Sequence, residues 1–135
     1  MQYSNNIITK LIEFINEDDF LSTLGIAIRA FDTRGLPVPI NETYFSLSCK
    51  KNSSVFSKSE ENEPIVKDSL TINLSCFSPL KKSAYSAHNL TEKVISAICS
   101  EFRENISGFS IGETQYDDDV KSYKIVGNIY FDFSS

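Results

Sequence analysis

The chain has 135 residues, with 13 Lys and Arg against 18 Asp and Glu, which gives a net charge of −5 at neutral pH. This length predicts one domain, residues 1–135, and the 41% hydrophobic share is too high for a disordered chain. Nucleic-acid binding relies on clustered Lys and Arg, so the acidic balance argues against sequence-specific binding of nucleic acid.

The first residues contain no basic region ahead of an apolar run, and no apolar stretch approaches the roughly 20 residues that cross a bilayer. We therefore expect a soluble protein without a secretory signal and without membrane contact. Cys49, Cys76 and Cys99 are widely spaced and form no CxxC pair. We expect them to be small buried hydrophobic side chains of a protein that folds in a reducing cytoplasm.

The first half of the chain predicts one helix and two strands. Apolar residues over 8–15 recur at helical spacing, and Asn5 or Asn6 can cap that helix. A short strand is expected over 26–31. A second strand is expected over 44–50, where apolar and polar residues alternate.

The polar stretch that follows predicts a long mobile loop over residues 51–64, within the single domain. Val55 and Phe56 are adjacent hydrophobic residues in this stretch, and such a pair in a solvated loop is typical of a docking element. An alternative stays open, in which these two residues extend the flanking strands into a longer hairpin.

Residues 65–77 have the clearest strand pattern in the chain. Leu70, Ile72, Leu74 and Cys76 alternate with hydroxyl and amide side chains, so one face should pack on a core and the other should meet water or a polar partner. A second amphipathic helix is expected over 84–102. Two further strands, 106–116 and 121–133, are joined by Asp117, Asp118 and Asp119.

The element order is therefore α-β-β-β-α-β-β. It predicts an α+β two-layer sandwich, with a mainly antiparallel sheet of about five strands and two amphipathic helices on one face. The opposite face and the edge strands would then be available to other subunits.

Reactive groups are few in this sequence. His88 is the only histidine, which excludes a histidine pair within one chain, and a surface or capping role is favoured over that of a general base. The three consecutive aspartates lack the rest of a calcium loop and predict a solvated turn. We expect no catalytic residues, no metal site and no cofactor, and hence no enzyme.

The order and size of the elements resemble those of small tail-terminator or collar proteins of tailed bacteriophages and phage-tail-like bacteriocins. The stretches that carry the resemblance are Pro37–Pro39, Cys76–Leu80, Gly112–Tyr116 and Ile129–Phe133. The resemblance implies a ring, usually a hexamer, that caps the head-proximal end of a tail tube. Its partners would be further copies of itself, the tail tube protein and, in contractile particles, the sheath protein. The protein would assemble in the bacterial host cytoplasm and then become part of the virion or particle.

Two other functions stay open. The protein could be a neck, head-completion or baseplate component of the same kind of particle. It could also bind a small molecule in a pocket between helices and sheet, lined by Tyr44, Tyr123, Tyr130 and Phe109. Exposure arguments alone give the candidate subunit contacts of the assembly protein, which are Val55, Phe56, Thr71, Asn73, Ser75, Tyr116, Asp117, Asp118 and Asp119.

Overall fold

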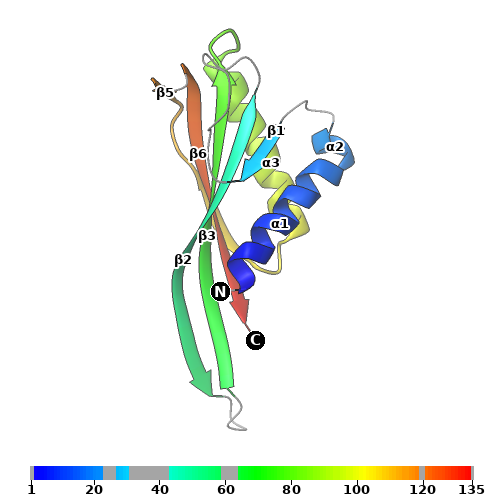
Figure 1. Cartoon of the computed structure of the whole chain (residues 1–135), viewed down its shortest axis with the longest axis vertical. Helices are drawn as coiled ribbons and strands as arrows, with labels where there is room; N and C mark the ends of the chain where they lie inside the picture. The colour runs from blue at the N-terminus through cyan, green and yellow to red at the C-terminus, as the bar shows by residue number, and fades with distance from the viewer. Residues whose placement is uncertain (1, 23–26, 31–42, 59–63, 119–120, 135) are drawn as a thin grey trace.

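The computed structural model describes residues 2–22, 27–30, 43–58, 64–118 and 121–134 (Figure 1). In chain order the elements are α1 (Gln2–Glu17), α2 (Asp19–Ser22), β1 (Ala27–Ala30), β2 (Tyr44–Lys58), β3 (Pro64–Pro79), α3 (Ala84–Glu101), β4 (Ile106–Ile111), β5 (Gln115–Asp117) and β6 (Ser122–Ser134).

The strands form one sheet in the order β1-β2-β3-β6-β4, and β5 pairs with β6 beside β4. Helices α1 and α3 lie on the same side of this sheet (Figure 1), where Phe14 of α1 meets Phe102 at the end of α3 edge to face, at 5.8 Å between ring centroids. The expected α+β arrangement, with a mainly antiparallel sheet and two amphipathic helices, is therefore confirmed.

The core lies between the helices and one face of the sheet. Alternate residues of β3, namely Leu70, Ile72 and Leu74, are fully buried, as period-two alternation predicts. Further fully buried side chains come from α1, β2, α3 and β6, and include Leu11, Phe45, Leu47, Val94, Ile95, Ile98, Ile125, Ile129 and Phe131. Cys76 is buried in this core, whereas Cys49 and Cys99 are half-buried and all three thiols are free.

A side chain caps the N-terminus of α3 and that of α2. Ser83 accepts a hydrogen bond from the backbone N–H of Ser86 at 3.0 Å, which caps α3. Asp18 accepts one from the N–H of Leu21 at 3.0 Å, which starts the short helix α2. One carboxylate of the acidic stretch Glu17–Asp19 therefore has a structural role in the turn after α1.

The predicted loop over 51–64 is wrong for the residues that the structure describes. β2 continues to Lys58 and β3 begins at Pro64, so the longer hairpin is the arrangement found, with Val55 opposite Lys67 and Phe56 opposite Val66. Residues 59–63 lie outside the described part. The polar composition was misleading because a strand that extends past the core needs no alternating apolar residues, and a β-bulge between Lys51 and Ser53 interrupts the period.

Two further details differ from the sequence prediction. β1 pairs with β2 in parallel, not antiparallel, because about a dozen residues (31–43) separate them, which is long enough for the connection that parallel neighbours need. The strand predicted over 106–116 is divided into β4 and β5, because the strand is interrupted at residues 112–114, although Gly112 still donates its N–H to the carbonyl of Val126 on β6. Among the described residues, no helix has the length and apolar character needed to cross a membrane.

Candidate functional site

The sheet has one face on which no described helix packs, and we call this the open face. Its residues are those that alternate with the core residues of β2, β3 and β6. Thr71, Asn73 and Ser75 of β3 lie on it and are half-buried, as the sequence predicted for a polar face. Their neighbours in register are Ser46, Ser48 and Lys50 of β2 and Val126, Asn128 and Tyr130 of β6.

Polar side chains of the open face are tied to one another across the strands. Ser69 donates to the carboxylate of its register partner Asp132 at 2.7 Å. Between β6 and β4, Asn128 donates to Ser110 Oγ at 3.4 Å, and Ser110 Oγ lies 3.2 Å from the hydroxyl of Tyr130. Such cross-strand bonds fix the orientation of donors and acceptors on a sheet surface. This face is thus an ordered polar surface suited to contact another polar surface.

The strand pattern of residues 65–77 already placed Ser69 on the polar face, whereas Ser110, Asn128 and Asp132 were missed as members of this surface. The alternation of β6 was visible, since its core residues were recognised, and the intervening positions could have been assigned to the other face. Which of them meet across strands depends on the register of β3, β6 and β4. That register pairs positions 43–67 residues apart between β3 and β6 and 16–25 residues apart between β4 and β6.

The hairpin of β2 and β3 extends past the helices (Figure 1). We call its far part the arm, which consists of Val55–Lys58 paired with Pro64–Lys67. The last three pairs of the arm also lie past Ser134, where β6 stops pairing with β3. Val55 and Phe56, both predicted as contact residues, lie in the arm. A two-stranded ribbon that has no other strand beside it is of marginal stability in water.

The acidic residues predicted as contacts lie at the opposite end of the sheet, around β5. Tyr116 is 52% exposed and stands opposite Tyr123 in register. Asp118 forms an ion pair with Lys121 at 2.8 Å, and Asp119 lies outside the described residues. These residues do not converge with the arm or with Thr71, Asn73 and Ser75, because β5 pairs with the start of β6 and the arm lies past its end.

Asp117, on β5, contacts Lys124 of β6, which in turn contacts Phe77 of β3. The Asp117 carboxylate lies 3.9 Å from Nζ of Lys124, and the same ammonium lies 5.3 Å from the ring centroid of the buried Phe77. A cation above an aromatic face is attracted by the ring quadrupole. Lys124 therefore links β5 to β3, which gives Asp117 a structural role in addition to its predicted place at an interface.

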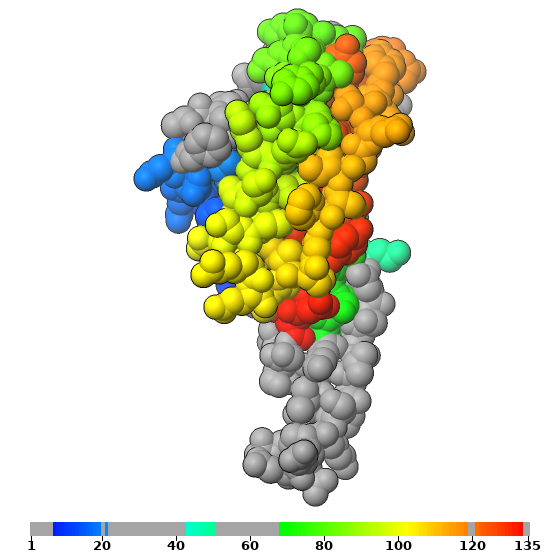
Figure 2. Space-filling model, turned by 180° about the vertical axis from the view of Figure 1, so that it is seen from behind, coloured from blue at the N-terminus to red at the C-terminus, as the bar shows by residue number. Residues whose placement is uncertain are grey.

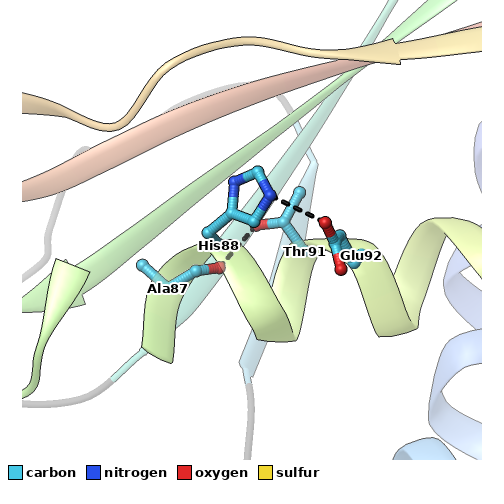
Figure 3. A network of polar contacts seen from close by, with 4 residues as sticks. All are labelled: Ala87, His88, Thr91 and Glu92. Carbon is cyan, nitrogen blue, oxygen red and sulfur yellow. Dashed lines mark hydrogen bonds and ion pairs between the residues drawn. The ribbon is translucent and has the colours of Figure 1, made fainter. Parts of the chain in front are cut away.

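His88 lies on the outer side of α3, in a short polar network (Figure 3). Its Nε2 atom is 2.7 Å from the carboxylate of Glu92 one turn further along, and both side chains are partly exposed. Thr91, between them on the buried side, donates its hydroxyl to the carbonyl oxygen of Ala87 at 2.9 Å. The network contains one histidine and one carboxylate in a surface pair, which is the surface role predicted for His88.

The four aromatic residues proposed to line a small-molecule pocket do not face a common cavity. The register places Tyr44 and Tyr130 on the open face, whereas Phe109 and Tyr123 lie on the side that the helices cover. A surface hollow exists elsewhere, at the end of α3, lined by residues 100–105. Within the described ranges, no group of three or more His, Cys, Asp or Glu side chains is placed to hold a metal ion.

Comparison with known proteins adds no relative. No model of a known protein family matches the chain, and a search of curated proteins finds none that is similar to it in sequence.

Proposed function

We propose that this chain is a structural assembly protein that forms a closed ring and caps the head-proximal end of a phage tail or phage-like tail tube. The assembly part of this proposal is supported by the described geometry. The tail-terminator or collar part is supported by the resemblance in element order and size. The partners would be further copies of the chain, the tail tube protein and, in contractile particles, the sheath protein.

The arm is the observation that carries the proposal. It extends the sheet past the two helices, where a ribbon of this kind gains stability only if something else packs on it. Its eight paired residues include Val55, Phe56, Ile65 and Val66. A segment with so many apolar residues is suited to bury surface against a second molecule.

The open face supports the same proposal. Sheets that are covered on one face and left with free edges are prone to pair with other chains, and oligomers use such surfaces as interfaces. Half-buried hydroxyl and amide groups at Thr71, Asn73 and Ser75 would give a polar, hydrated interface of the kind found between subunits that assemble from folded monomers.

The test is the mass of the assembled species. Native mass spectrometry and sedimentation of the purified protein, alone and mixed with its tail tube protein, should give one closed ring, expected as a hexamer. The matched variant Asn73→Arg places a long charged side chain on the open face, and it should keep the circular dichroism of the wild type while shifting the population towards monomer. A wild type that remains monomeric in both samples contradicts the proposal.

A further inference from the structure

Two edges of the sheet have no strand beside them in the described part of the chain. β1 pairs only with Tyr44–Leu47, so the outer edge of β2 is unpaired by any described strand from Ser48 to Lys58. At the other side, β4 ends the sheet order and pairs only with β6. Figure 2 shows β4 and β5 at the surface of the molecule, beside α3. One molecule therefore offers two different strand edges.

The hydrogen bonds of β4 indicate which of its backbone groups are available. Gly112 donates its N–H to the carbonyl of Val126, its neighbour in register on β6. Bonding in an antiparallel pair alternates along the strand, so Ser110 also bonds to β6, whereas the N–H and C=O of Phe109 and Ile111 point away from it. These outward groups form the row that an added strand requires.

The two edges differ in charge. The segment Ser48–Lys58 contains Lys50, Lys51 and Lys58 and no acidic residue. β4 itself contains no charged residue, and of the acidic residues that follow it, Asp117 and Asp118 already lie beside Lys124 and Lys121, which leaves the exposed Glu113. Pairing of two β2 edges would bring lysines together, whereas pairing of a β2 edge with β4 would bring lysines towards Glu113, and charges across an interface select partner and register.

We propose that the outer edge of β2 in one copy pairs with β4 of the next copy, so that copies join head to tail through a continuous sheet. The occupant of each edge is thus a second copy of this chain. Joining of unlike edges is heterologous, and such a contact gives a ring when the rotation closes. This inference rests on the proposed function, because it names the contact by which the ring forms.

Two variants each block one edge. Phe109→Pro removes a backbone N–H that makes no bond to β6, and proline is tolerated at such an edge position. Its control, Phe109→Thr, removes the aromatic side chain but keeps the backbone N–H. The β2 variant is Lys50→Glu, Lys51→Glu and Lys58→Glu together. Its control changes the exposed Lys81, Lys82 and Lys93 to Glu, for the same change in net charge. Each blocked variant should raise the dissociation constant at least about tenfold over its control.

Mixing the two blocked variants gives the sharpest result. The Phe109→Pro protein keeps a basic β2 edge and the β2 variant keeps an intact β4, so an equimolar mixture should form a 1:1 dimer and nothing larger, as measured by native mass spectrometry. Circular dichroism and the melting temperature show whether each variant folds. If the Phe109→Pro variant does not fold, the comparison of the β2 variant with its control tests the contact without it.

The outcomes separate this contact from ring formation as such. If wild type and both blocked variants assemble equally, or if the blocked mixture forms no dimer while the wild type forms a ring, the contact lies elsewhere and this inference is wrong, although the assembly proposal stands. A wild type that stays monomeric overturns both.

Discussion

Ile95 of α3 packs directly on Gly127 of β6. A Cβ atom built on Gly127 would lie 2.5 Å from the Cδ1 atom of Ile95, closer than real Cβ atoms approach a neighbour. Gly127 also stands between Leu74 and Ile111 in register, in the middle of the sheet. The absence of a side chain at residue 127 thus allows the helix to lie close to the strand.

This contact gives the first prediction. Gly127→Ala should lower the free energy of unfolding by about 1 kcal/mol, the low end for overpacking, because the Cδ1 end of the Ile95 side chain must move to make room for the added methyl group. Ile95→Val removes the Cδ1 atom, so the double variant should recover part of that loss, as measured by urea denaturation of both single variants and the double variant. Simple addition of the two single losses would show that the two residues do not press on each other.

The second prediction concerns buried hydroxyl groups. The hydroxyls of Thr43, Ser78 and Ser122 are buried and have no hydrogen-bond partner among the residues that the structure describes. A buried polar group without a partner costs free energy, so Ser78→Ala should raise the free energy of unfolding by about 1 kcal/mol. Ser75→Ala, on the open face, is the control and should change it by less than about 0.5 kcal/mol. A loss of stability in Ser78→Ala would mean that this hydroxyl has a partner in solution.

The third prediction concerns stability at high pH. Burial raises the pKa of the Cys76 thiol to about 11 from its ordinary 9.0, although the Thr91 hydroxyl and the Lys82 charge act in the opposite direction. Between these two values the unfolded chain loses the proton and the folded chain keeps it, so stability falls as the pH rises. The two-unit difference corresponds to about 2–3 kcal/mol by pH 11.

Cys76→Ala removes this titration, so the gap in unfolding free energy between wild type and variant should narrow by that amount from pH 8 to pH 11. All other ionisable side chains are common to both proteins, so their contributions cancel in the difference. A gap that stays constant over this range would show that Cys76 ionises normally in the folded protein.

The fourth prediction concerns the arm. Replacing Val55 and Phe56 together with Ser should leave the melting temperature of the monomer within about 2 °C of the wild type, because four strand pairs at the end of the hairpin add little to the body. Assembly should weaken, as measured by the dissociation constant in sedimentation. If the double variant unfolds instead, the two residues belong to the core of the folded chain.

Strict periodicity explains what could be predicted from the sequence. The alternation in β3 and β6 and the helical spacing in α3 report directly which residues a core buries, so these elements and the α+β class follow from pattern alone. The arm and the parallel pairing of β1 could not be predicted in this way. The arm extends past the core, which leaves no periodic signal, and the direction of β1 depends on a partner that lies beyond a long connection.

The candidate surface residues likewise include some that the sequence pattern predicts and some that require knowledge of the fold. Thr71, Asn73 and Ser75 were assigned to a polar face because their own strand alternates. Asp117 and Asp118 were treated as a solvated turn that could contact a subunit, but their pairing with Lys124 and Lys121 needs the fold of the β5–β6 corner. The charge difference between the two free edges needs the strand order, which no local pattern contains.

The central position of β3 also has a consequence for how the chain reaches this structure. β3 pairs with β2 through a local hairpin. Its other edge is paired only when β6, about 60 residues further along the chain, docks beside it. Closing so long a loop costs entropy before any contact rewards it, and topologies of this kind fold slowly. The hairpin should thus form early in folding, and docking of the last strand should set the rate.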